Sequence, residues 1–124
     1  MWQLLFALAA FFNFAVATAM LAAPERIALH LSITGPGAPF VVATVGMLIG
    51  AFGVGYALAA YQPRHHHGVI LIGMLSKFGV AGLGALQYAA GIIPLRYLAL
   101  AMGDVAFAAL FALFLWRARR GWAH

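Results

Sequence analysis

Four long apolar stretches constrain the fold of this chain more than any other feature. They run over residues 2–22, 40–61, 68–89 and 97–116. A helix needs about 20 mainly apolar residues to cross a bilayer, and each stretch reaches that length. No Lys or Arg precedes the first stretch, which is longer than the apolar core of a secretory signal, so we expect it to remain as a membrane anchor. The sequence predicts an all-α integral membrane protein of one domain, built as a four-transmembrane-helix bundle.

The composition excludes a soluble protein. Of the 124 residues, 66% are hydrophobic and 7% are charged, whereas an average soluble domain carries roughly 25% charged residues. A soluble fold of this size has too much surface to cover with so few charges, and intrinsic disorder needs the opposite composition. The chain has no cysteine, which excludes disulfides, thiolate metal sites, iron–sulfur clusters and cysteine catalysis.

The connections between the stretches carry the proline, glycine and charged residues that end helices. The longest connection, residues 23–39, is predicted to be a loop on the outer side of the membrane. Apolar residues alternate strictly with others from Ile27 to Thr34, which favours an extended segment. However, Pro24-Glu25 also resembles a helix start with proline at the first position. The sequence leaves a short strand and an interfacial helix open.

The basic residues predict an orientation in the membrane. The formal net charge is +5, and Lys and Arg in short loops favour the cytoplasmic side. One predicted side carries four arginines and the other carries two, namely Arg64, Arg117, Arg119 and Arg120 against Arg26 and Arg96. We therefore expect a protein of the cell inner membrane with both termini cytoplasmic. These residues suit the anionic headgroups of the lipid bilayer, and no basic stripe interleaved with aromatics indicates nucleic acid as a partner.

Two charged residues, Lys77 and Asp104, lie deep inside the third and fourth stretches. With a rise of about 1.5 Å per residue, Lys77 is roughly 13–14 Å from the start of its helix and Asp104 roughly 18 Å from Trp116. An ionised side chain at the bilayer centre costs about 2.5–3.5 kcal/mol on insertion scales. We therefore predict an ion pair between these helices. Side chains of antiparallel helices lean apart by depth, a gap that the Lys stem or a water would bridge.

Small residues flank both charges and would let the two helices approach closely. They are Gly73, Ala81 and Gly84 in the third stretch and Ala101 and Ala108 in the fourth. For Lys77 and Asp104, a structural pair and a proton or solute site both stay open. Asn13, at about the same depth in the first stretch, would converge with them. For Asn13 and for Tyr56, toward the cytoplasmic end of the second stretch, we prefer a structural interpretation.

Two further motifs are weaker. His65, His66 and His67 are consecutive, so their rings do not point one way, and no acidic residue is near in sequence. We expect a cytoplasmic, lipid-facing loop that gains charge below a pH of about 6.5 rather than a metal site. Gly46-x-x-x-Gly50 is a helix-packing motif that fits an oligomer face or packing within the bundle. No histidine pair lies within the stretches, so no haem or other cofactor is predicted.

The chain resembles small bacterial four-helix membrane proteins of the DoxX-like type. The resemblance covers nearly the whole chain and is carried by Asn13, Gly53-Val54-Gly55-Tyr56, Ser76-Lys77, Gly103-Asp104 and Phe111. It implies a four-helix fold and, for some members, a role as subunit or partner in quinone-linked sulfur or redox metabolism. This chain has no cysteine or haem ligands for a redox centre, so that activity is not carried over.

These observations favour a non-enzymatic accessory or assembly subunit with a buried Lys77–Asp104 pair. The alternative is a small homo-oligomeric transporter or proton-conducting protein in which Asp104 or Lys77 titrates. A membrane enzyme or metal protein ranks third, because metal ligands are scarce and two acidic residues in the whole chain leave little for general acid–base catalysis. The expected partners are the lipid bilayer and either other membrane subunits or further copies of this chain.

Overall fold

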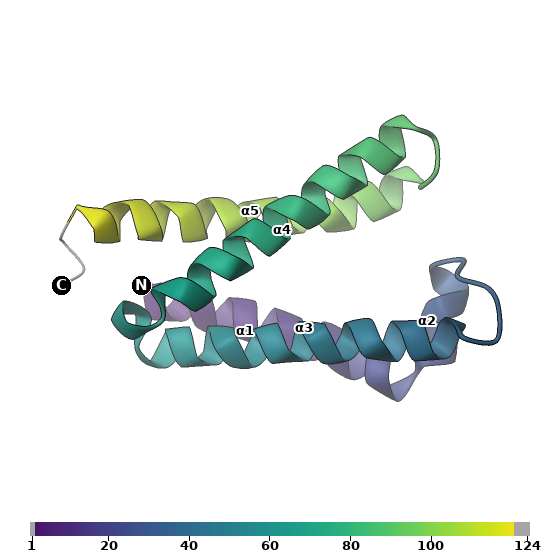
Figure 1. Cartoon of the computed structure of the whole chain (residues 1–124), viewed down its shortest axis with the longest axis horizontal. Helices are drawn as coiled ribbons and strands as arrows, with labels where there is room; N and C mark the ends of the chain where they lie inside the picture. Colours follow the sequence, from purple (N-terminus) through teal and green to yellow (C-terminus); the bar gives the residue numbers. More distant parts are fainter. Residues whose placement is uncertain (1, 121–124) are drawn as a thin grey trace. The chain divides into compact units, whose positions relative to one another are not determined.

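The computed structural model describes residues 2–120, apart from the side chain of Leu100, and this part contains helices and no β-strand (Figure 1). The all-α prediction is therefore confirmed. In chain order the elements are α1 (Trp2–Ala22), α2 (Pro24–His30), α3 (Ala38–Tyr61), the 3-10 turn η1 (Pro63–His65), α4 (His67–Ala89) and α5 (Leu95–Arg119).

Four of these helices are long and apolar enough to cross a membrane: α1, α3, α4 and α5, with 21, 24, 23 and 25 residues. Their ends lie within three residues of the predicted ones. Many large apolar side chains on them are exposed, for example Phe11, Met47 and Leu83. A soluble protein rarely exposes so much contiguous apolar surface, whereas lipid tails cover it at no cost. The chain is a multi-pass helical membrane protein in contact with the bilayer.

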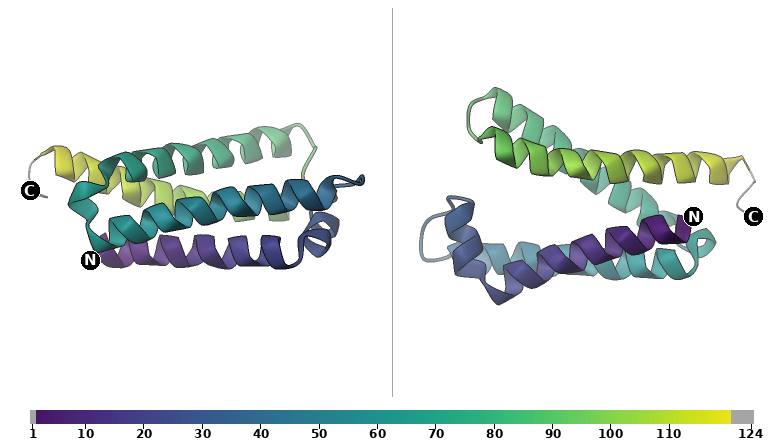
Figure 2. Two further views of the ribbon diagram at one scale, coloured as in Figure 1. Left: turned by 60° about the horizontal axis from the view of Figure 1, so that its bottom comes forward. Right: turned by 180° about the vertical axis from the view of Figure 1, so that it is seen from behind.

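The helices form two compact units that divide between Gln62 and Pro63. In the first unit, α1 and α3 run antiparallel and α2 lies at one end of them (Figure 2). In the second unit, α4 and α5 form an antiparallel hairpin. In the second unit a short connection joins the two packed helices, as is common, whereas in the first unit α1 and α3 pack together although α2 lies between them in sequence.

The connection predicted over residues 23–39 is helical in its first half, so the extended alternative is wrong for α2. Pro24 occupies the first turn, where a missing N–H leaves no helix bond unmade. The helix ends in a Schellman motif, with Ser32 at φ 58° and its N–H donating to Leu29 O at 3.1 Å. The N–H of Ile33 donates to Ala28 O at 2.9 Å. Ile27 and Ile33 pack against the buried cluster around Ala28, whereas Leu29 is exposed, so the alternating apolar residues do not share one face as they would in a strand.

Glycines bring α3 into close contact with α1. A Cβ atom placed on Gly46 would lie 2.8 Å from Met20 Cβ, and one on Gly50 would lie 3.4 Å from Ala17 Cβ. Such distances mean that the two backbones approach as closely as small residues allow. The Gly46-x-x-x-Gly50 motif, for which the sequence left two uses open, therefore packs α3 against α1 within the first unit.

The second unit closes at a tight turn after α4. Gly91, with φ 76°, lies in the left-handed region that favours glycine. Its N–H donates to Tyr88 O at 3.0 Å and the N–H of Ile92 donates to Gln87 O at 2.9 Å, a second Schellman motif. Pro94 then precedes α5 in an extended conformation. This turn places the middle of α5 beside the middle of α4.

Candidate functional site

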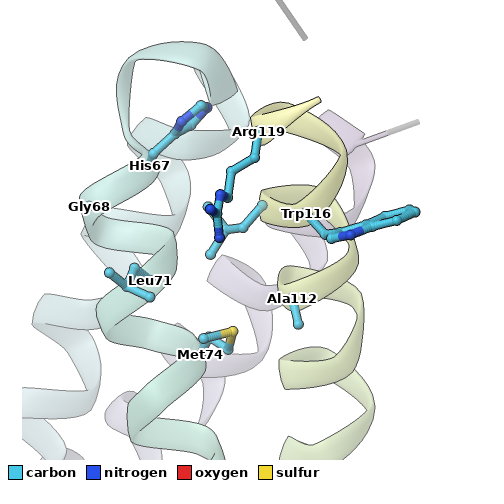
Figure 3. A pocket seen from close by; sticks show the side chains of 8 residues that line it. His67, Gly68, Leu71, Met74, Ala112, Trp116 and Arg119 are labelled. Carbon is cyan, nitrogen blue, oxygen red and sulfur yellow. The ribbon is translucent and has the colours of Figure 1, made fainter. Parts of the chain in front are cut away.

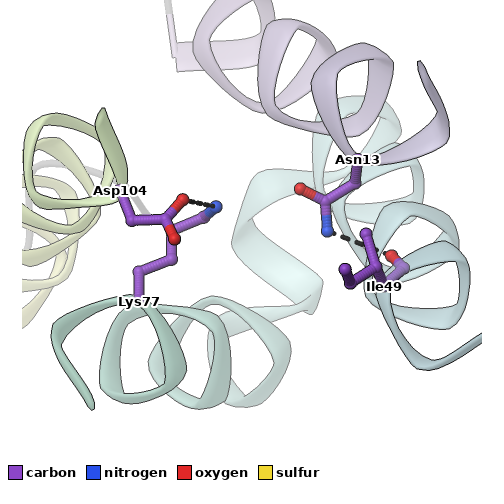
Figure 4. Close-up of polar contacts among 4 residues, drawn as sticks. All are labelled: Asn13, Ile49, Lys77 and Asp104. Carbon is purple, nitrogen blue, oxygen red and sulfur yellow. Dashed lines mark hydrogen bonds and ion pairs between the residues drawn. The ribbon is translucent and has the colours of Figure 1, made fainter. Parts of the chain in front are cut away.

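Lys77 on α4 and Asp104 on α5 meet in the second unit (Figure 4). Lys77 Nζ donates a hydrogen bond to Asp104 Oδ1 at 3.1 Å, within ion-pair distance. The contact is direct, so the Lys stem alone bridges the depth offset between the two antiparallel helices. The pair is of the charge-assisted kind, which is stronger than a bond between neutral groups.

The two partners are not equally buried. The Lys77 side chain is 6% exposed and the Asp104 side chain 20%. Lys77 Nζ also lies 5.2 Å from the ring centre of Phe107, a cation–π contact. Phe107 follows Asp104 by three residues on α5, so one face of that helix presents both a carboxylate and an aromatic ring. The ammonium group therefore finds both of these partners on the neighbouring helix of its own unit.

Small residues on both helices make room for the pair. Gly73 and Ala81 lie one turn before and one turn after Lys77, and both are buried. Ala108 follows Asp104 by one turn and is fully buried. A Cβ atom placed on Gly84 would lie 3.1 Å from Ala101 Cβ, so the helices touch beside the pair as well. The predicted small-residue faces are therefore the contacting faces of α4 and α5.

Asn13 makes its contact in the first unit (Figure 4). Its Nδ2 donates a hydrogen bond to the backbone oxygen of Ile49 on α3 at 3.0 Å, and the residue is buried. Gly53, one turn after Ile49, opens the space for this contact, because a Cβ atom there would lie 3.3 Å from Asn13 Cβ. The amide thus ties α1 to α3, whereas Lys77 and Asp104 meet within the second unit.

Tyr56 is buried on α3, with 1% of its surface exposed. Its ring lies 6.3 Å from that of Phe52, one turn earlier on the same helix. The large buried ring fills the interior of the protein.

The three consecutive histidines lie in different settings. His65 ends η1 and is exposed, His66 precedes α4, and His67 is its first residue. Over residues 2–120, no group of three His, Cys, Asp or Glu side chains is arranged to hold a metal ion. His67 departs from the predicted lipid-facing loop, because its ring packs edge-on against Phe114, with centroids 5.5 Å apart.

A groove that the sequence did not predict lies between α4 and α5, at the ends that carry His67 and Arg119 (Figure 3). Its volume is about 550 Å³, and most of its lining is apolar, including Leu71 and Met74. The sequence places Arg119 near a helix end, but only the crossing of two helices creates a groove. No periodicity in either helix alone carries that information.

Comparisons of the chain with protein-family models, curated proteins and solved structures give no match. The functional argument therefore depends on the geometry of the chain's own residues. That argument uses the Lys77–Asp104 pair and the residues exposed on the surface of each unit.

Proposed function

We propose that this chain is a non-enzymatic accessory or assembly subunit of a membrane complex, in which the Lys77–Asp104 pair holds α4 and α5 together. The single observation that carries the proposal is the direct contact at 3.1 Å between Lys77 Nζ and Asp104 Oδ1, supplemented by the Phe107 ring. Each charge finds its counter-charge on the neighbouring helix of the same hairpin. A hairpin whose charges are matched in this way is a rigid element on which a partner helix can assemble.

The acidic residues of the chain support a non-enzymatic role. There are two in the whole sequence, of which Asp104 is bound to Lys77 and Glu25 lies exposed in the first turn of α2. General acid–base chemistry commonly uses a pair of groups that converge on one substrate. Glu25 and Asp104 belong to different units, and Asp104 is already paired with Lys77.

The outer surface of α4 supports assembly with a partner helix. Leu75, Gly79, Gly82 and Leu86 follow one another at intervals of four, three and four residues, which places them on one helical face. All four are exposed, and nothing lies within 4 Å of a Cβ atom placed on either glycine. Glycines flanked by leucines let another transmembrane helix approach closely. We propose this face, named the α4 glycine face, as the assembly surface.

The test is gentle purification of the chain from its native membrane, followed by native mass spectrometry and absorbance. We expect a stoichiometric membrane partner that is lost when both Gly79 and Gly82 are replaced by isoleucine. Val54→Ile, at another exposed apolar position, is the matched control and should keep the partner. Recovery of the wild-type chain without any other protein would contradict the accessory role.

A second candidate is a small homo-oligomeric transporter or proton conductor that uses Asp104 and Lys77. The observation that favours it is the residual exposure of Asp104, 20% against 6% for Lys77. An intramembrane carboxylate that keeps access to its surroundings can exchange a proton, and such residues are commonly functional. Reconstitution of the purified chain in liposomes with a pH-sensitive dye tests it. A flux that Asp104→Asn removes would favour transport over assembly.

The proposal includes the cell inner membrane as location and a cytoplasmic position of both termini. The support is the arginine distribution, with four on the side of η1 and the end of α5 and two on the other side. The resemblance to DoxX-like proteins, some of which are subunits of larger systems, agrees with an accessory role.

A further inference from the structure

The groove between α4 and α5 has the size and lining of a site for an amphiphile (Figure 3). Its volume of about 550 Å³ falls within the range of roughly 300–1,000 Å³ typical of small-molecule sites. Its lining includes Leu71, Met74 and Leu115, with His67, Trp116 and Arg119 toward the helix ends. Apolar walls with polar groups at one end match a molecule that has a charged head and an apolar tail.

Within residues 2–120, no acidic side chain neutralises the positive charge at this groove. Among residues 2–120, Arg119 has no ion-pair partner, and Arg117 and Arg120 add charge in the same turn. The second unit contains one acidic residue, Asp104, which lies 15 residues before Arg119, about 22 Å along the helix, and is bound to Lys77. The described residues around the groove therefore carry an excess of positive charge, which attracts an anion.

A second polar group at the groove lacks a partner. The Nε2 atom of His67 is buried and makes no hydrogen bond with the described residues. Native proteins satisfy nearly all buried polar atoms, so an orphaned one calls for a bound molecule or another explanation. His67 lines the same groove as Arg119. The atom has almost no accessible surface, so the His67 ring must turn before a molecule in the groove can bond to it.

The groove also lies at the depth of the lipid headgroups. If the Lys77–Asp104 pair marks the membrane midplane, His67 lies ten residues away along α4, about 15 Å. This distance equals half of a hydrocarbon core about 30 Å thick. Met74 lies about 4.5 Å from the level of Lys77 by the same rise. The groove thus extends from the headgroup level toward the acyl chains, and Trp116 occupies an interfacial position.

We propose that this groove binds one anionic phospholipid. Its phosphate accepts hydrogen bonds from the Arg119 guanidinium, which suits bidentate phosphate contacts, and from the Nε2–H of His67 once that ring has turned. One acyl chain follows Leu71, Met74 and Leu115 into the membrane. The site goes beyond the proposed assembly role, because it lies between α4 and α5 and uses neither the Lys77–Asp104 pair nor the α4 glycine face.

Native mass spectrometry of the purified full-length chain with added phosphatidylglycerol or phosphatidylcholine tests the site. We expect one tightly held phosphatidylglycerol and no retained phosphatidylcholine. Arg119→Gln should weaken phosphatidylglycerol binding about fivefold, the effect of one basic side chain near a membrane surface. Arg117→Gln removes the same charge from an exposed position outside the groove lining and should bind nearly as the wild type. Ala112→Leu, which narrows the groove while keeping every charge, should also weaken binding.

Four results would overturn the proposal, the last of them given by Ala112→Leu. Equal losses in Arg117→Gln and Arg119→Gln would indicate diffuse attraction rather than a site. Equal retention of both lipids would remove the role of the anionic head. Displacement of phosphatidylglycerol by inorganic phosphate would show that a free anion suffices. Circular dichroism and thermal unfolding verify that each variant is folded. If Arg119→Gln does not fold, Ala112→Leu decides, and undiminished lipid binding by that variant contradicts the site.

Discussion

At the residue scale, Asn13 and Lys77 are the buried polar residues that join one span to another. Asn13 reaches a backbone oxygen of α3 from α1, and Lys77 reaches a carboxylate of α5 from α4. The two contacts differ in what their loss would leave behind. The Ile49 oxygen is a neutral backbone group of a helix, whereas removal of one charged partner leaves a buried ion. Loss of one partner should therefore destabilise the protein more at the Lys77–Asp104 pair than at the Asn13 contact.

A double-mutant cycle measures that sensitivity. Lys77→Met and Asp104→Leu should each destabilise the chain by about 3–5 kcal/mol, because each leaves an uncompensated buried charge. Asp104→Leu should be the more harmful of the two, since it strands the less exposed partner. The double variant should recover most of the stability. Thermal unfolding in detergent provides the measurement.

The outcome also separates the two candidate functions. A double variant whose loss equals the sum of the single losses would contradict a pairwise structural contact. A double variant that unfolds like the wild type, keeps its membrane partner and shows no change in liposome flux supports the assembly role. One that folds well but loses a flux present in the wild type supports transport.

At the element scale, the long helices were predictable and their partners were not. The ends of α1, α3, α4 and α5 lie within three residues of prediction because the bilayer requires a nearly fixed apolar length. The Gly46-x-x-x-Gly50 motif indicates close packing but not against which helix, a question that only the contact with Met20 and Ala17 answers. The helical state of α2 was ambiguous because the alternation from Ile27 to Thr34 resembles a strand, whereas Pro24-Glu25 resembles a helix start.

The candidate site was predictable to a similar extent. Lys77 and Asp104 stand out because charged residues are rare in apolar spans. The unfavourable free energy of burying a charge in the membrane predicts that the two residues pair. The groove at His67 and Arg119 was not predictable, since its volume depends on how α4 and α5 cross. The sequence also does not show which of the three consecutive histidines has a buried ring nitrogen without a hydrogen bond, as His67 does.

The α1–α3 contact makes a prediction about glycine. Gly46→Ala places a Cβ atom 2.8 Å from Met20 Cβ, and such overpacking costs about 1–3 kcal/mol, against a gain of up to about 1 kcal/mol in helix propensity. We expect a net loss of stability in thermal unfolding of the purified chain. Gly79→Ala is the matched control, since nothing lies within 4 Å of its Cβ position, and it should be neutral or stabilising. Equal effects of the two substitutions would contradict close packing of α1 on α3.

At the scale of the whole molecule, the four spans and the arginine distribution together predict a topology that single cysteines can test. The sequence contains no cysteine, so one introduced thiol is a unique reporter. Thr34 and Gln62 are exposed residues just beyond opposite ends of α3, and Ile92 is exposed in the turn between α4 and α5. If every long helix spans the bilayer, Thr34 and Ile92 lie on one side and Gln62 lies on the other.

With both termini cytoplasmic, a membrane-impermeant maleimide should label Thr34→Cys and Ile92→Cys in intact cells, and Gln62→Cys only after permeabilisation. The reverse pattern would mean that the positive-inside rule fails for this chain. Labelling of all three from outside would indicate a mixture of both orientations. A difference of four arginines against two would then be too small to orient every molecule the same way. In that case, adding a lysine beside Gln62 should shift the population toward the predicted orientation. A topology that responds to one added charge would show that the loops, rather than the apolar spans, decide how this protein lies in its membrane.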